Sequence, residues 1–193
     1  MLSEEYRQQL RQMHEPDEDG RVWGATACRH VYEIVDTYNH SLKAYAEDDD
    51  IEPEDYEMLD YGSSDGKLAF QIERRNLLPY TTIFEYDPGV RGREYDNIPC
   101  HFVVCFDVLE HIEPDYLEAV LEDLKRCTRH RGLFQISLQP AKQILPDGRN
   151  AHLIVESAEW WTDQVSKYFN IVWATHNREL KYLKLYVEKV YED

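Results

Sequence analysis

With 193 residues, the chain is long enough for a single domain with a sizeable hydrophobic core. Its formal net charge of −17 disfavours binding to nucleic-acid phosphates, and no run approaches the roughly 20 apolar residues of a membrane span. No signal peptide opens the chain, so we expect a soluble, cytoplasmic protein. From the charge and the absence of a long apolar run, we expect neither a nucleic acid nor a membrane as its partner.

Helical periodicity marks the N-terminal part of the chain. Apolar residues recur at helical spacing over 3–13 and 27–46, with a turn-rich segment between them. An acidic stretch over 47–57 is typical of a solvated linker. The sequence therefore predicts a helical cap over 1–50 in front of a core over 57–193, the two together forming one domain.

A strand, a glycine loop and a helix follow over 57–76. The loop places Gly62 and Gly66 on either side of two serines and an aspartate. Glycines let a backbone turn tightly and approach a ligand, and the helix start offers unpaired N–H groups. The loop lacks the full Gly-x-Gly-x-x-Gly pattern, so it gives little support to a nicotinamide dehydrogenase, and an ordinary strand-to-helix turn would look similar.

Two further predicted strands end in polar residues. The strand over 82–86 runs into Asp87, at the position where doubly wound folds place a ribose-binding acid. The strand over 102–106 is continuously apolar, as a strand buried on both faces should be, and it ends in Asp107-Val-Leu-Glu-His111. We expect these polar groups to meet at one edge of the sheet.

The second half of the core begins with a helix over 114–128, which we expect Gly132 to stop, and a strand over 133–138. The basic residues over 125–131 are interpreted as cations that complement the end of this helix, not as a nucleic-acid site.

A polar loop over 139–152 then leads to a helix that Ser157 caps and that carries Trp160 and Trp161, of which one is expected in the core. Alternating segments over 169–175 and 182–190 predict an antiparallel strand pair. The four cysteines have no close pairing, so buried thiols are expected and no metal site is predicted.

Three segments resemble the class I S-adenosylmethionine-dependent methyltransferases: Leu59-Asp60-Tyr-Gly62-Ser-Ser-Asp65-Gly66, Asp87-Pro88, and Val104-Cys-Phe-Asp107-Val-Leu-Glu-His111-Ile. The resemblance covers about residues 57–190 and fits small stand-alone members of that family. It implies an α/β fold with a doubly wound, Rossmann-like, mostly parallel sheet, an antiparallel C-terminal strand pair and an N-terminal helical cap. Two features depart from the family pattern: a serine replaces the middle glycine of the loop, and no clear third strand follows Asp87.

The resemblance further implies that S-adenosylmethionine is the cofactor. The glycine loop would cradle its methionine half with Asp60 nearby, and Asp87 would hold its ribose hydroxyls, while Asp96 or Asn97 is the best guess for the adenine contact. The cofactor-binding residues implied in this way are Asp60, Gly62, Ser63, Ser64, Gly66, Asp87, Pro88, Asp107 and Val108.

Methyl transfer to an oxygen or nitrogen atom of a small molecule is the leading functional hypothesis. His152 and His111 are the best-placed candidates for a base, because the histidine pKa lies near neutrality, and Glu110 is the nearest carboxylate. Candidate substrate-binding residues are Arg149, Asn150 and Trp23, and Tyr6 and His14 join Trp23 as possible lid residues.

Two other functions stay open at this point. One is methylation of RNA, DNA or protein, which a basic rim around the pocket would favour. The other is a non-catalytic, cofactor-binding partner subunit, which an extensive apolar surface would favour. The oligomeric state and the identity of the acceptor have no readable pattern in the sequence.

Overall fold

The computed structural model describes residues 2–15, 26–46, 52, 55–94 and 97–191. The strands of its sheet are β1 (Met58–Tyr61), β2 (Ile83–Tyr86), β3 (Cys100–Phe106), β4 (Thr128–Ser137), β5 (Phe169–Asn177) and β6 (Tyr182–Lys189). They lie in the order β2-β1-β3-β4-β6-β5. β2, β1, β3 and β4 are parallel, and β6 runs antiparallel to both β4 and β5. The predicted mostly parallel sheet with its antiparallel C-terminal pair is confirmed.

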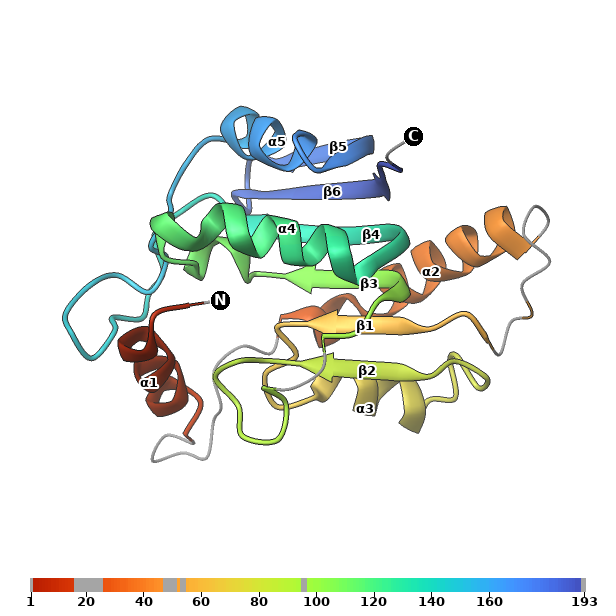
Figure 1. Cartoon of the computed structure of the whole chain (residues 1–193), viewed down its shortest axis with the longest axis horizontal. Coiled ribbons are helices and arrows are strands. Elements are labelled where there is room, and N and C mark those ends of the chain that lie inside the picture. Colours follow the sequence, from red (N-terminus) through yellow and green to blue (C-terminus); the bar gives the residue numbers. More distant parts are fainter. Residues whose placement is uncertain (1, 16–25, 47–51, 53–54, 95–96, 192–193) are drawn as a thin grey trace.

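Helices cover both faces of this sheet and one of its edges. They are α1 (Glu4–Met13), η1 (Ala27–His30), α2 (Val31–Ala46), α3 (Lys67–Arg74), η3 (Leu109–His111), η4 (Pro114–Tyr116), α4 (Leu117–Cys127) and α5 (Ala158–Ser166). The core cluster on one face takes its helical residues from α1, η3, α4 and α5, and the cluster on the other face takes them from α2 and α3. Figure 1 shows α1 beside the carboxyl ends of β1, β2 and β3, toward which the arrowheads point. None of the described helices has the length and apolar character needed to cross a membrane.

The continuously apolar run of β3 is buried on both faces, as predicted. Val103 and Cys105 pack into the cluster beneath α4, whereas Phe102 and Val104 pack into the cluster beneath α2. All four are fully buried. Alternate side chains of one strand therefore support both layers, which is why the sequence shows no polar residue in this run.

The sheet ends at β2, because no further strand forms between Asp87 and Cys100 in the part of that segment that the structure describes. Turns occupy residues 88–93 instead. This agrees with the sequence, which shows no clear third strand there.

The prediction that Gly132 stops the helix after Pro114 is wrong. α4 ends at Cys127, and β4 begins with Thr128, whose backbone is extended and whose hydroxyl donates a 2.8 Å hydrogen bond to the Leu124 carbonyl. The Thr128 backbone N–H donates to the same carbonyl, so the helix ends at a threonine with an extended backbone and not at a glycine. Gly132 lies within β4, where a Cβ atom would sit 3.1 Å from the Val103 carbonyl oxygen and 2.8 Å from the Phe134 ring.

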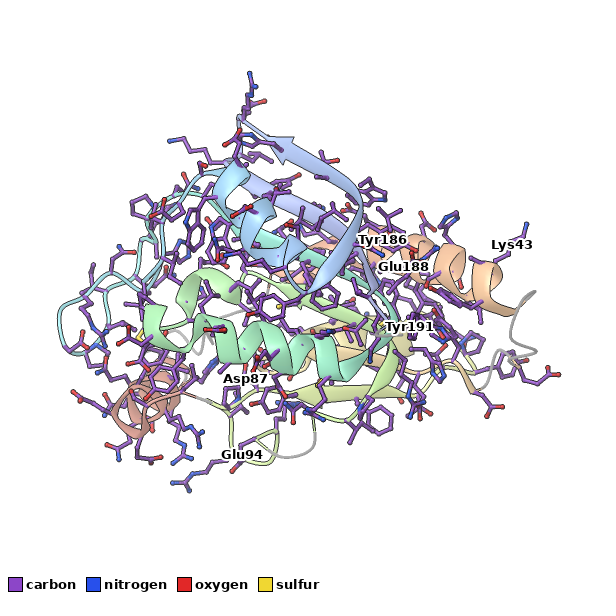
Figure 2. The ribbon with its side chains drawn as sticks, turned by 45° about the horizontal axis from the view of Figure 1, so that its top comes forward. Lys43, Asp87, Glu94, Tyr186, Glu188 and Tyr191 are labelled. Atoms are coloured by element: carbon purple, nitrogen blue, oxygen red, sulfur yellow. The ribbon has the colours of Figure 1, made fainter. Side chains whose placement is uncertain are left out.

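The basic residues around position 130 are therefore partly strand residues. Arg131 pairs with Glu188 at 2.9 Å and donates to the Tyr186 hydroxyl at 3.1 Å, while the His130 ring stacks on Tyr45 at 3.9 Å. Figure 2 shows Tyr186 and Glu188 together on β6. These residues serve packing between β4, β6 and α2, in agreement with a structural role.

Candidate active site

The switch point of the sheet lies at the carboxyl end of β1. β1 has β2 on one side and β3 on the other, so the chain leaves β1 in one direction and returns in the opposite one. In open α/β sheets, ligands bind in the crevice outside such a point. The glycine loop, Asp87 and the segment after β3 all follow strands that end here.

The glycine loop is held in a left-handed backbone conformation. Gly62, Ser64 and Gly66 have φ angles of +86°, +50° and +77°. The Gly62 and Ser63 amides both donate to the Tyr86 carbonyl, at 2.7 and 3.0 Å. Ser64 at the middle position thus adopts a backbone conformation that favours glycine. Contacts with residues outside the loop must offset the cost of this conformation.

A side chain at either glycine would meet close neighbours, and at Gly66 these are the mobile ends of two long side chains. A Cβ atom on Gly62 would lie 2.3 Å from Val108 Cγ2. On Gly66 it would lie 2.4 Å from Glu85 Oε1 and 2.5 Å from Arg93 Nη2. The loop is therefore packed between the segment that follows β3 and the end of β2.

Asp87 holds this loop to the end of β2. Its two carboxylate oxygens accept hydrogen bonds from the Ser64 amide at 2.9 Å and the Gly89 amide at 2.8 Å. The side chain is buried, with His14 Nε2 3.8 Å from its Oδ1 atom. Figure 2 shows Asp87 near α1 and far from Tyr186 and Glu188. The predicted ribose-binding acid thus lies beside the glycine loop.

α1 covers this edge of the sheet. The Nδ1 atom of His14, at the C-terminus of α1, lies 3.4 Å from the Ser64 hydroxyl oxygen. The Tyr6 hydroxyl donates a hydrogen bond to the His111 carbonyl at 2.5 Å. Both predicted lid residues therefore contact the segments that follow the strands. Trp23, the third one, lies outside the described residues, as does Asp96.

Asn97 was a candidate for the adenine contact but packs elsewhere, whereas Arg93 was not predicted and contacts the glycine loop. The Asn97 side chain donates to Asp123 and its carbonyl accepts from Arg126 at 2.7 Å, so Asn97 contacts α4. Arg93, which sequence reasoning missed, donates to the Ser64 carbonyl at 2.9 Å and pairs with Glu85 at 3.5 Å. The glycine-rich turn before Arg93 is the feature of the sequence that marks its approach to the loop.

Negative charge accumulates around Asp60, which is 2% exposed. Burial, with smaller contributions from Glu85 and Asp87, raises the pKa of the Asp60 carboxyl to about 8, although Arg93 opposes the shift. Asp60 is therefore mostly protonated at pH 7. A ligand that brings positive charge to this edge would favour its ionisation.

Asp60→Asn is expected to stabilise the ligand-free protein at pH 7 by roughly 2–4 kcal/mol, because asparagine resembles the neutral acid and cannot ionise. The folded-state pKa lies above the unfolded one, so wild-type stability falls as pH rises from 4 to 8 and the variant escapes this loss. Urea unfolding at pH 4, 6 and 8 measures the difference, with Asp65→Asn as the control. A variant no more stable than wild type at pH 8 would contradict the assignment.

Asp107 and Glu110 follow β3. Asp107 has a φ of +53° and accepts a 3.0 Å hydrogen bond from the Gln135 side chain. Glu110 is fully buried, and its Oε1 atom accepts from the Ser137 amide at 2.9 Å. Its Oε2 atom has no hydrogen-bond partner among the described residues. Burial, followed by the Asp107 charge, raises the pKa of Glu110 well above its usual range.

The two candidate histidines lie against each other, with ring centroids 4.6 Å apart. His111 Nδ1 bonds to the Ala151 carbonyl at 2.7 Å, and His152 Nδ1 bonds to the Gln139 carbonyl at 2.5 Å. Burial, with the neighbouring His152 as second cause, lowers the pKa of His111 to about 3, so its imidazole is neutral at pH 7. The structure therefore brings the three candidate catalytic residues together.

Asn150 and Arg149 shape the loop that carries His152. The Asn150 side chain bonds to both the amide and the carbonyl of Ala141, each at 2.9 Å, and accepts from the His152 amide at 3.0 Å. Arg149 pairs with Asp147 at 2.7 Å, and its guanidinium lies 6.0 Å from the centre of the Tyr6 ring. Two of the three predicted substrate residues therefore make contacts within this loop or with Tyr6, and Trp23 lies outside the described residues.

A separate hollow of about 610 Å³ lies between α4 and α5. Its lining includes Leu117, Leu121 and Trp160, but none of the predicted site residues. Trp161 is fully buried, so one of the two tryptophans is in the core as expected.

No protein-family model matches the sequence, and no curated protein matches it. Solved structures do share its fold. A SAM-dependent methyltransferase from Aquifex aeolicus is 12% identical with a TM-score of 0.52, over 84% of this chain and 98% of that chain. The [4+2]-cyclase SpnF is 11% identical with a TM-score of 0.51, over 91% of this chain and 85% of that chain.

An O-methyltransferase family protein from Burkholderia thailandensis is 11% identical with a TM-score of 0.50, over 87% of this chain and 63% of that chain. Identities this low establish the fold alone. The chain therefore has the Rossmann-like fold of class I methyltransferases, as the resemblance implied.

Proposed function

We propose that this chain is an enzyme that transfers a methyl group from S-adenosylmethionine to an oxygen or nitrogen atom of a small molecule. The observation that carries the proposal is the left-handed loop over 62–66, tied by Asp87 to the end of β2 at the switch point of the sheet. The fold shared with a SAM-dependent methyltransferase supports it.

The residues at this edge fit a nucleoside that carries positive charge. S-adenosylmethionine has a sulfonium and an ammonium group, and it supplies an electrophilic methyl group when bound. The buried Asp60 carboxyl suits a cation, and the Ser63 hydroxyl is buried without a hydrogen-bond partner among the described residues. Gly62, Ser64 and Gly66 would lie beside the methionine half, with Asp87 and Pro88 toward the ribose and Asp107 and Val108 across the loop.

The acceptor would lie near Glu110, His111 and His152. A hydroxyl or protonated amine must lose a proton to become a methyl acceptor, and a positioned base can take it. His152 is the candidate base, because its imidazole lies on the loop after β4, against the neutral His111. His111 and Glu110 would orient it. In-line placement of the acceptor beside the methyl group would supply much of the acceleration.

A small acceptor suits this site better than a polymer. α1 packs over the carboxyl edge, where a Cβ on Gly89 would lie 2.9 Å from Leu10, so the site lies beneath a helix. The net charge of −17 opposes phosphate backbones. The described basic residues near position 130 lie at the opposite end of β3 and β4 from the glycine loop.

Calorimetric titration with S-adenosylmethionine, S-adenosylhomocysteine and NAD tests the cofactor. We expect micromolar binding of the first two and none of NAD. His152→Ala should leave both affinities within about twofold, because its side chain is assigned to the acceptor. Absence of binding of both sulfur compounds would overturn the proposal.

A further inference from the structure

Glu110, His111 and His152 each offer a ligand atom within 4.8 Å of those of the other two. We propose that these three side chains bind a divalent first-row transition metal ion such as Zn²⁺, which holds an oxygen atom of the substrate. The metal site stands on its own geometry. The identity of that oxygen as a methyl acceptor rests on the function proposed above.

The tautomers of both histidines favour metal binding. A backbone carbonyl can only accept, so the Nδ1 atoms that bond to Ala151 and Gln139 must carry the hydrogens. In a neutral imidazole this leaves the lone pair on Nε2. A metal-binding histidine almost always donates its other ring N–H to a carbonyl, carboxylate or water in this way, which fixes the ring and makes the ligand nitrogen more basic.

Glu110 supplies the charge that a metal ion would neutralise. Ser137 satisfies one of its oxygens, but the other is buried without a hydrogen-bond partner among the described residues. A fully buried carboxylate without a counter-charge is costly, so it either binds a proton or faces a cation.

The three ligand atoms need to move only slightly closer together to coordinate one ion. Ligand atoms about 2.0–2.1 Å from a tetrahedral zinc ion lie about 3.3 Å from one another. The groups lie at most 4.8 Å apart, so they must close by up to about 1.5 Å. His152 is half-buried on the loop over 139–152, where a small shift disturbs the core least.

Two histidines and one carboxylate select the class of metal. Imidazole nitrogens favour zinc, iron, nickel and copper over magnesium and calcium, which prefer oxygen ligands. Three protein ligands leave a coordination position open, which is the arrangement of catalytic sites, whereas structural zinc sites have four protein ligands. The site therefore suits an ion that also binds substrate.

The ion would change how the acceptor is activated. A hydroxyl oxygen bound to it would lose its proton to water at lower pH, as metal-bound water does. That oxygen would then form the bond to the methyl carbon while the carbon–sulfur bond breaks and its electron pair stays on sulfur, which would give S-adenosylhomocysteine. His152 would serve as a ligand in this arrangement, and a separate base would not be needed.

Zinc titration of EDTA-treated, dialysed protein tests the site. We expect one equivalent of Zn²⁺ to bind with micromolar or tighter affinity, weakened at least 30-fold in His152→Ala. The matched control is His176→Ala, which removes an exposed histidine from β5 and should leave zinc binding unchanged. Co²⁺ should give visible absorption bands in the wild type that His152→Ala loses. Thermal melting shows that each variant is folded.

No stoichiometric binding, or equal loss of affinity in His152→Ala and His176→Ala, would overturn the metal site. Glu110→Gln provides a second variant, and unchanged zinc affinity in a folded Glu110→Gln protein would also count against it. S-adenosylhomocysteine titration of the same samples reports separately on the proposed function. If the protein binds zinc but not S-adenosylhomocysteine, the metal site is supported and its role in methyl transfer is removed. If it binds S-adenosylhomocysteine but not zinc, the proposed function is supported and the metal site is overturned.

Discussion

Gly62→Ala is expected to destabilise the protein by roughly 2–5 kcal/mol, combining about 1–2 kcal/mol for a side chain at left-handed φ with 1–3 kcal/mol for overpacking. The φ angle of Gly62 is +86°, and a methyl group there would lie 2.3 Å from Val108 Cγ2. The loop can escape this contact by moving away from Val108. S-adenosylmethionine affinity should then fall at least tenfold, because the loop forms its proposed site.

Two controls separate the causes of this loss. Gly92 has the same φ of +86° but no heavy atom within 4 Å of its added Cβ, so Gly92→Ala should show the backbone cost alone. Val108→Ala added to Gly62→Ala should recover the packing part. Urea unfolding and calorimetry measure both effects. Equal stability losses in Gly62→Ala and Gly92→Ala would show that the Val108 contact is unimportant.

The strands and the glycine loop were predictable because their causes are local in sequence. A continuously apolar run such as Phe102–Phe106 indicates a strand that is buried on both faces, and Gly62 and Gly66 mark a turn. The end of α4 was predicted to within one residue, but Gly132 was wrongly given as its stop signal, because the helix ends where the Thr128 backbone becomes extended. Glycine is one of several ways to end a helix.

Lys184 shows a second limit of sequence reasoning. The alternation in β6 predicts that Leu183 and its neighbours two apart share the core face, which the structure confirms. The same pattern suggests that Lys184 faces solvent, yet it is 4% exposed and lies 5.5 Å from the centre of the Phe106 ring. α2 covers this face and supplies Glu33 as the counter-charge. A partner from a distant helix has no trace in the local pattern.

The candidate site was predicted as a set of positions, but not as a set of contacts. Each strand end could be located, and with it Asp87, Glu110 and His111. The interactions that decide their chemistry cross the chain: Glu110 bonds to Ser137, and the tautomer of His111 depends on a carbonyl of the loop after β4. Such contacts depend on tertiary packing, which residue spacing alone does not specify.

Asp87→Ala is expected to cost roughly 2–6 kcal/mol of stability, because it leaves the buried Ser64 and Gly89 amides without their acceptor, at about 1–3 kcal/mol each. Asp87→Asn should cost less, since its amide oxygen can still accept one of the two bonds. The free energy of unfolding in urea should therefore be highest for the wild type, intermediate for Asp87→Asn and lowest for Asp87→Ala. Asp65→Ala, which removes a loop acid paired with Lys67, is the control.

The affinity for S-adenosylmethionine separates the two roles of Asp87. If the carboxylate only ties the loop to β2, affinity should follow stability, and Asp87→Asn should lie between wild type and Asp87→Ala. If it also binds the ribose hydroxyls, Asp87→Asn should lose nearly as much affinity as Asp87→Ala, at least tenfold, because charge-assisted hydrogen bonds are about twice as strong as neutral ones. We expect the second result. Wild-type affinity in a folded Asp87→Ala variant would remove Asp87 from the cofactor site.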